Sequence, residues 1–97
     1  MFIRIIKYRL PNSTKSNLFL NLIKAEMIPM YAKKSECLSV EFLSIGEGQL
    51  LSIAKYKSKD DYDATSKWSL PIFTKNVKEL EGTLEALPGE IIASYYK

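Results

Sequence analysis

The sequence predicts an α+β domain in which a four-stranded antiparallel sheet is backed by helices. Segments rich in β-branched and aromatic residues, typical of strands, occupy four ranges: 2–10, 37–45, 49–57 and 90–96. Two segments, which begin after Asn12 and at Ser58, instead place apolar residues three and four positions apart, as amphipathic helices do. The short turn 46–48 joins the second and third strands as an antiparallel hairpin. The resulting order is the ferredoxin-like βαββαβ arrangement, in a single domain over residues 1–97.

The first predicted strand, Phe2–Leu10, stops at Pro11 and is partly apolar on both of its faces. This pattern is typical of a sheet that is covered on both sides. Arg4 lies in the middle of the strand among apolar neighbours, where burying its charge is costly unless the charge is paired. Either a carboxylate such as Glu41 or an anionic ligand would supply that partner.

The first predicted helix follows a group of N-cap oxygens at residues 12–14, and its apolar stripe continues to Tyr31. Pro29 lies inside the stripe and has no N–H. It is therefore expected to kink the helix, or to close one segment and open the next. The positive charges of Lys33 and Lys34 suit the carboxyl end of this helix.

The second predicted helix has Ser58 as its N-cap and Asp61 at the capping-box position. Further along, Ser69 and Pro71 together indicate that the helix restarts, with Ser69 as a new cap and Pro71 in a first turn. The apolar stripe then continues to residue 87. The helix is therefore expected to reach Pro88, and the last strand to span residues 90–96.

The charge pattern and the cysteine count limit the partners and the compartment. The net charge is +3, but the lysines are scattered and interleaved with acidic residues, which indicates a solvated surface rather than a nucleic-acid interface. No apolar run approaches the length of a membrane span, and residues 1–10 carry charges where a signal peptide would be apolar. The single cysteine cannot form an internal disulfide. We expect a cytosolic protein that binds neither nucleic acid nor membrane.

The chain contains no histidine. This excludes acid–base catalysis by histidine, activation of a Ser or Cys nucleophile by imidazole, and an axial histidine to haem. Cys37, without histidine neighbours, makes a zinc site improbable, and no glycine-rich phosphate loop or metal-ligand spacing is present. The sequence therefore predicts no metal and no cofactor, and it identifies no catalytic set.

Three stretches of the sequence resemble the antibiotic-biosynthesis monooxygenase family of the dimeric α+β barrel superfamily: FIRIIKYRLPNSTKSNLFLNL, IPMYAKKSECLSVEFL and SIAKYKSKDDYDATSKWSLPIF. The resemblance covers nearly the whole chain, in layout more than in signature. A proline often interrupts the first helix in the family, and Pro29 fits this pattern. Residues 36–38, Glu-Cys-Leu, stand where a glycine turn is usual.

This resemblance implies a homodimer in which two sheets pack face to face. It also implies a pocket between each sheet and its own helices, sized for a small aromatic or quinone-like molecule. Family members oxidise such molecules with O2, several of them without metal or flavin. Haem-degrading relatives use an Asn, a Trp and a His; here the His is missing, Trp68 is slightly off register, and Lys7–Tyr8 replaces the Asn. Haem degradation is therefore disfavoured.

Seven residues are candidates to line such a pocket: Trp68, Tyr8, Tyr56, Tyr31, Phe73, Asn76 and Arg4. The indole of Trp68 would stack a planar substrate, and the phenols of Tyr8 and Tyr56 would hydrogen-bond a substrate oxygen or supply a proton. Asn76 would orient a carbonyl. Each aromatic residue has core packing as its alternative role, and Asn76 has an exposed helix face.

Two functions remain open from the sequence. The first is a cofactor-independent monooxygenase, an oxidoreductase acting on a small aromatic or quinol-type molecule. The second is a non-catalytic ligand-binding or assembly domain of the same fold, whose helix–sheet space is filled by its own side chains. If the structure shows no cavity bordered by Trp68 and the tyrosines, the enzyme interpretation falls; if such a cavity exists, oxygen uptake with quinols decides between the two functions.

Overall fold

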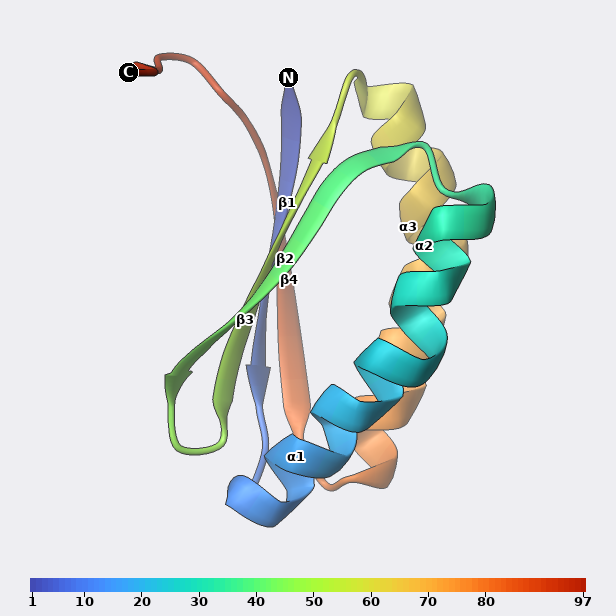
Figure 1. The fold of residues 1–97 in the computed structure, drawn as a ribbon, viewed down its shortest axis with the longest axis vertical. Coiled ribbons are helices and arrows are strands. Elements are labelled where there is room, and N and C mark those ends of the chain that lie inside the picture. The colour runs from blue at the N-terminus through green and yellow to red at the C-terminus, as the bar shows by residue number, and fades with distance from the viewer.

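All the helices lie on one face of a four-stranded antiparallel sheet (Figure 1). The structure, a computed structural model, describes residues 1–97. Its elements in chain order are β1 (Phe2–Arg9), α1 (Ser13–Leu22), η1 (Ile23–Met27), α2 (Ile28–Lys34), β2 (Cys37–Gly46), β3 (Gln49–Tyr56), α3 (Lys59–Glu79) and β4 (Thr83–Glu90). The strands are ordered β2-β3-β1-β4, and every neighbouring pair is antiparallel. The ferredoxin-like βαββαβ fold with a four-stranded antiparallel sheet is therefore confirmed.

The first helical stretch is divided just before Pro29, as expected. Asn12 caps α1 by accepting a hydrogen bond from the backbone N–H of Lys15 at 2.9 Å. The short π-helical segment η1 then precedes α2, which holds Pro29 in its first turn. In this segment the N–H of Ile28 bonds to the carbonyl of Ile23, five residues back. This π-helical turn lies directly before Pro29, which has no N–H and cannot donate the hydrogen bond that an α-helix makes to the carbonyl four residues back.

The second helix is continuous, so the predicted restart at Pro71 is wrong. Ser58 does cap α3, and its hydroxyl accepts from the N–H of Asp61 at 3.2 Å. Pro71 lies inside α3 with its ring exposed, where the loss of one backbone hydrogen bond does not end the helix. Ser69 is not a cap, because its hydroxyl donates to the carbonyl of Thr65 at 2.8 Å.

The last strand begins earlier than predicted, and the assignment of a strand to residues 90–96 is wrong. The helix ends at Glu79 and β4 covers Thr83–Glu90, paired with β1 along its whole length. A Cβ at Gly82 would lie 2.5 Å from the carbonyl oxygen of Arg9, so only glycine lets the chain pass β1 this closely. Beyond β4, the N–H of Ile91 still donates to the carbonyl of Met1 at 3.1 Å, but residues 91–97 form no strand.

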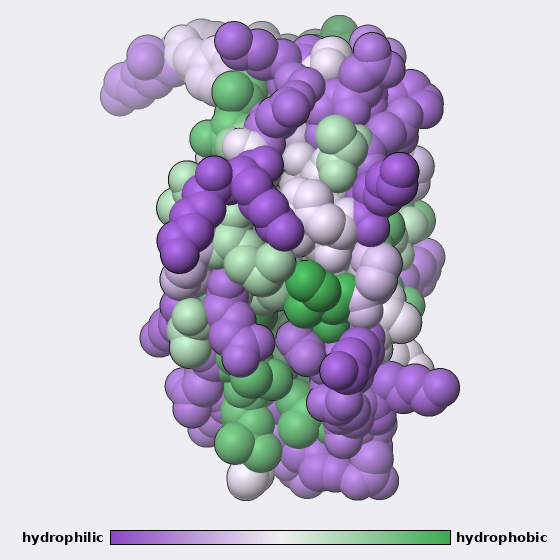
Figure 2. Space-filling model, turned by 90° about the vertical axis from the view of Figure 1, so that its right-hand side faces the viewer, coloured by the Kyte–Doolittle hydropathy of each residue, from purple (hydrophilic) through white to green (hydrophobic).

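A buried core fills the space between the sheet and the helices. Its members are Ile6, Tyr8, Leu10, Phe19, Ile23, Met27, Tyr31, Leu50, Phe73 and Val77. The outer surface of the helices is mostly hydrophilic, with smaller hydrophobic patches (Figure 2). No helix is long and apolar enough to cross a membrane.

The other face of the sheet carries no helix and is also partly apolar. We call it the open face; the strand registers place on it Ile3, Ile5, Leu43, Ile45, Leu51, Ile53 and Leu87. Leu43, Ile45 and Leu87 are each more than a third exposed there. The two-sided apolar pattern predicted for the first strand is therefore present, with one of its two sides uncovered.

Candidate functional site

The most unusual group in the helix–sheet space is the guanidinium of Arg4, which is 1% exposed. Its Nη1 donates to the hydroxyls of Ser66 and Ser69 at 2.8 and 2.9 Å, and its Nη2 donates to the hydroxyl of Tyr31 at 2.9 Å. These partners come from α3 and α2, so Arg4 connects β1 to both of these helices. We call Arg4 and the side chains around it the Arg4 cluster: Arg4, Tyr31, Tyr56, Thr65, Ser66 and Ser69.

The Arg4 cluster contains no negative charge. The structure has two ion pairs, Lys15–Glu81 and Lys59–Asp63, and neither involves Arg4. The carboxylate partner predicted for Arg4, Glu41, is instead exposed on β2, where it pairs in register with Ile53 of the open face. That prediction is wrong because successive residues of a strand point to opposite faces, and Glu41 points away from the helices.

Three buried polar atoms of the Arg4 cluster make no well-formed hydrogen bond: Arg4 Nε, Thr65 Oγ1 and the Tyr56 hydroxyl, which lies beside the thiol of Cys37. Buried polar groups in folded proteins are almost always paired. An unmade bond of this kind costs about 1–3 kcal/mol. These atoms therefore mark polar groups of the core that its own side chains leave unsatisfied.

The tyrosines of the site stay neutral. Burial raises the pKa of Tyr31, while the nearby charge of Arg4 acts in the opposite direction. Burial also raises the pKa of Tyr56 and of Tyr8 well above the ordinary value. All three phenols are therefore protonated at neutral pH and can act as hydrogen-bond donors, but not as bases.

The structure does not bring Tyr8 and Tyr56 together. In the β1–β3 register Tyr8 faces Leu50 and Tyr56 faces Phe2, which puts the two tyrosines at opposite ends of the strand pair. Six residues of strand separate these positions, about 20 Å. The Tyr8 hydroxyl is hydrogen-bonded to the Ser52 hydroxyl at 2.9 Å, and the ring of Tyr8 packs against Phe19 and Phe73 in the core.

Trp68 lies at the edge of the Arg4 cluster. Its ring is partly buried against Tyr31, with 5.1 Å between the ring centroids. The ammonium of Lys34 lies over the indole ring of Trp68, 5.1 Å from the ring centroid. Trp68 therefore contacts the residue that accepts a hydrogen bond from Arg4, and it closes the cluster on the side of α2.

The other two candidates lie outside the Arg4 cluster. Phe73 is fully buried in the aromatic core beside Tyr8, with 5.7 Å between the ring centroids. Asn76 has a buried amide nitrogen without a partner, but it lies seven residues beyond Ser69 on α3, about 10 Å along the helix axis. Of the seven predicted residues, Arg4, Tyr31, Tyr56 and Trp68 are thus in or beside one cluster, and the rest are elsewhere.

The sequence prediction missed the three hydroxyl residues of α3 that complete the cluster: Thr65, Ser66 and Ser69. Only a weak signal was present: Ser69 lies one helical turn beyond Thr65 and Ser66, so the three hydroxyls fall on one side of a helix. Cys37, at the start of β2, is half-buried, and burial raises the pKa of its thiol. This makes Cys37 a poor nucleophile.

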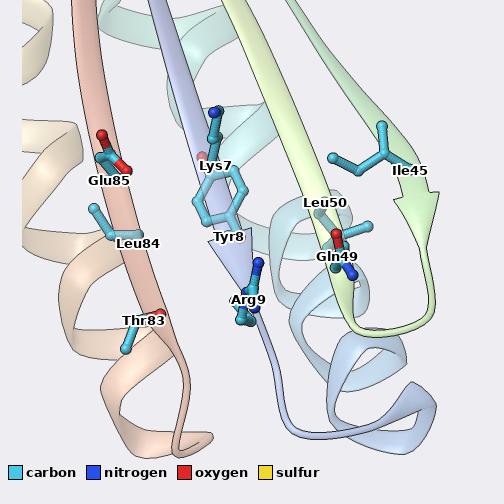
Figure 3. Close-up of a pocket in the computed structure, with 9 residues that line it drawn as sticks. All are labelled: Lys7, Tyr8, Arg9, Ile45, Gln49, Leu50, Thr83, Leu84 and Glu85. Carbon is cyan, nitrogen blue, oxygen red and sulfur yellow. The ribbon is translucent and has the colours of Figure 1, made fainter.

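The helix–sheet space is filled, and no surface hollow is bordered by Trp68 or Arg4. The hollow shown in Figure 3, about 270 Å³, lies on the sheet with the helices behind it and includes Lys7, Arg9 and Glu85. A shallow groove of about 270 Å³ lies between α2 and β2 and is lined by Tyr31 and Cys37. The predicted cavity bordered by Trp68 and the tyrosines is therefore not open. No group of three or more acidic or thiol side chains is placed to hold a metal ion.

Comparisons with known proteins identify the fold. No protein-family model and no curated protein matches the sequence. Among solved structures, the monooxygenase ActVA-Orf6 of Streptomyces coelicolor, in complex with nanaomycin D, matches with a TM-score of 0.80 and 11% identity, over 99% of this chain and 91% of that one. SnoaB, a cofactor-independent oxygenase from Streptomyces nogalater, matches with a TM-score of 0.75 and 11% identity, over 99% and 97%.

A dimeric ferredoxin-like protein from an uncultured marine organism also matches, with a TM-score of 0.77 and 10% identity, over the full length of both chains. The chain therefore has the same ferredoxin-like fold as these structures, which include the monooxygenases that the sequence resembles. At these identities the likeness establishes the fold alone.

Proposed function

We propose that the protein binds a small aromatic molecule of the phenol or quinol type in the helix–sheet space around Arg4. The observation that carries this proposal is the group of three buried polar atoms without partners: Arg4 Nε, Tyr56 OH and Thr65 Oγ1. A ligand hydroxyl or carbonyl would supply the missing partners, and Trp68 would stack on the ring. The similar folds of an oxygenase and of a monooxygenase in complex with nanaomycin D support this class of ligand.

Binding requires the space to open, because the protein's own side chains fill it. The groove between α2 and β2 reaches Tyr31, whose ring lies against Trp68. We propose that this pair separates to admit the ligand. Trp68 is the ring that moves, because it is only partly buried, whereas Tyr31 is held by the hydrogen bond from Arg4.

The filled helix–sheet space argues against an enzyme in the closed state, so we propose oxidation of the bound molecule by O2, without a cofactor, only for the opened state in which Trp68 has moved away from Tyr31. The Arg4 cluster offers hydrogen-bond donors but no base, so the substrate must lose its own proton readily. The deprotonated phenol or quinol would donate an electron to O2. For a phenol converted to a quinone, one oxygen atom enters the product and the other leaves as water, so no external reductant is needed. The roles of Trp68, Tyr31 and Tyr56 are to orient the ring and its oxygen.

Oxygen uptake with a panel of quinols and acidic phenols tests this proposal. We expect uptake by the wild-type protein above the uncatalysed rate, and a lower rate for Trp68→Phe, which shortens the stacking surface. Tyr96→Phe is the matched control, because Tyr96 is exposed in the C-terminal segment. Uptake that equals the rate without protein for every member of the panel contradicts the oxidation.

The second candidate function is a non-catalytic binding or assembly domain. It is favoured by one observation, the filled helix–sheet space, in which no hollow is bordered by Trp68. Calorimetric titration separates the two functions. Binding without oxygen uptake identifies a ligand-binding domain, and the absence of both identifies an assembly domain.

We also propose that the protein is a homodimer whose two open faces pack against each other. The open face carries seven apolar side chains on one side of the sheet, three of them more than a third exposed, and an uncovered apolar face of this kind marks an interaction site. The structural similarity to a dimeric ferredoxin-like protein supports this arrangement. The C-terminal segment adds to the uncovered apolar surface, with Ile92 94% exposed and Tyr95 84% exposed.

A further inference from the structure

The charge of Arg4 is buried without a counter-charge, and this constrains the ligand beyond its aromatic character. The three groups that accept hydrogen bonds from Arg4 are hydroxyls, which carry no charge. Burying a cation costs several kcal/mol unless a charge of opposite sign is close. The bound state of the protein is where such a charge can be supplied.

The guanidinium also has N–H groups that donate to no acceptor. An arginine side chain has five N–H groups. Three of them are used, two at Nη1 and one at Nη2, while the N–H of Nε has no partner. One N–H of Nη2 and that of Nε therefore remain, on a planar group whose geometry suits the oxygen of an anion.

No titratable group around Arg4 can provide the negative charge at neutral pH. Arg4 influences the pKa of four neighbouring groups: Tyr8 of β1, Tyr31 of α2, Cys37 of β2 and Tyr56 of β3. Burial raises the pKa of each of them, so all four are neutral. The neighbours from α3 are serine and threonine hydroxyls, which do not titrate.

We infer that the Arg4 cluster is an anion site, which binds the aromatic ligand through a single negatively charged oxygen group set against the free N–H groups of Arg4. This inference rests on the proposed binding of an aromatic molecule in the helix–sheet space. The chemical class is a ring that carries an acidic hydroxyl or a carboxylate. A neutral ring of the same shape leaves the charge of Arg4 uncompensated and binds more weakly.

Arg4 then has a second role, because its charge favours the form of the ligand that reacts with O2. A deprotonated hydroxyl is the electron-rich form that reduces O2, and the positive charge of Arg4 favours that form when the ligand is bound. Tyr31 and the two serines hold the guanidinium in place between β1 and the helices. Arg4 therefore selects the ionised ligand, while its neighbours position it.

Calorimetric titration with matched acidic and neutral probes tests the anion site. The probes are hydroxynaphthoquinone and its methyl ether, and naphthoate and its methyl ester, at a pH where both acids are ionised. A charge-assisted hydrogen bond is stronger than one between neutral groups, so we expect the acid of at least one pair to bind about tenfold or more tightly than its neutral partner. The pair that shows this preference identifies the anion as a phenolate-type oxygen or a carboxylate.

Substitution of Arg4 assigns the preference to its charge. We expect Arg4→Met to bind the acid and its neutral partner equally, and Arg4→Lys to restore part of the preference. Arg9→Met is the matched control, since Arg9 lies on the same strand but is exposed, and it should leave the preference intact. If Arg4→Met does not fold, the comparison of acid and neutral probes on the wild-type protein still decides whether an anion is preferred.

Each outcome is decisive. Equal affinity of the wild-type protein for both members of each pair overturns the anion site but leaves the binding of aromatic molecules in place. A preference that survives in Arg4→Met overturns the role of Arg4. Failure of the wild-type protein to bind any of the four probes contradicts the proposed function and the anion site together.

Discussion

Arg4 of β1 donates a hydrogen bond at 2.9 Å to the hydroxyl of Ser69 on α3, and that hydroxyl in turn donates to the carbonyl of Thr65 at 2.8 Å. Ser69 thereby connects the buried cation to the backbone of the helix. Both residues are almost completely buried, so water cannot replace either bond. The pair links the sheet to α3, the longest helix. A neutral side chain could make such a link, so the charge of Arg4 points to a role beyond structure.

Removing the Ser69 hydroxyl should destabilise the fold. We expect Ser69→Ala to lower the free energy of unfolding by about 1–3 kcal/mol, because a buried N–H of Arg4 loses its acceptor. Urea-induced unfolding followed by Trp68 fluorescence measures the change. Ser94→Ala, at an exposed position, is the control and should be neutral. A loss no larger than that of the control would show that Arg4 does not depend on this partner.

Stability should fall at high pH because of the buried tyrosines. Burial raises the pKa of Tyr8, Tyr31 and Tyr56 above the ordinary value of about 10. The folded protein then keeps protons that the unfolded chain has already lost. The resulting stabilisation is complete below about pH 10 and is lost as the pH rises through the folded-state pKa values, by up to about 1.4 kcal/mol per pH unit for each tyrosine.

Unfolding free energies measured in urea from about pH 8 to about pH 11 check this dependence. Tyr56→Phe should make the decline shallower, and it also removes a hydroxyl that has no partner. Tyr96→Phe, at an exposed tyrosine, should leave the slope as it is. Identical slopes for the wild-type protein and Tyr56→Phe would contradict the buried, neutral state of Tyr56.

Because α3 is continuous across Pro71, replacing this proline should stabilise the protein. Pro71→Ala supplies the missing N–H within an unbroken helix, so we expect the free energy of unfolding to rise by about 1–3 kcal/mol. Pro29→Ala is the matched control, because Pro29 lies in the first turn of α2, where the missing N–H costs little. A rise of equal size in both variants, in thermal or urea unfolding, would show that α3 is interrupted at Pro71.

Much of the fold could be predicted because local signals agree with tertiary packing. The hairpin turn at 46–48 and the Ser58 cap both have specific residue preferences and lie where expected. The end of α3 could not be predicted in the same way. Leu80, Leu84 and Leu87 are spaced as on a helix, yet Gly82 contacts β1, and Leu84 and Leu87 fall on β4. Contact between distant segments, and not local periodicity, decides this boundary.

The candidate site could be predicted only in part. Arg4 was identified because a charge in an apolar strand needs a partner, but the partners are hydroxyls of α3 rather than a carboxylate. Serines on a helix are more often caps or surface residues, so Ser66 and Ser69 carried no strong signal. The separation of Tyr8 from Tyr56 depends on strand register, which places them at opposite ends of β1 and β3.

The proposed dimer should depend on the centre of the open face. Ile53 pairs in register with Ile5 on β1 and with Glu41 on β2. We expect the wild-type protein to be a dimer by light scattering at micromolar concentration, and Ile53→Asp to be a monomer, because a buried carboxylate would meet an apolar partner surface. Leu18→Asp, on the exposed side of α1, should remain dimeric. A monomeric wild-type protein would contradict face-to-face packing of the sheets.

The central claim is that the helix–sheet space receives a ligand at Arg4, and a crystal structure of the protein with hydroxynaphthoquinone tests it most directly. We predict that the ring lies between β1 and α3, that an oxygen is within hydrogen-bond distance of Arg4 Nε, and that Trp68 has moved away from Tyr31, from their present centroid separation of 5.1 Å. A ligand bound only at the hollow beside Lys7 and Arg9, with the Arg4 cluster unchanged, would contradict the claim.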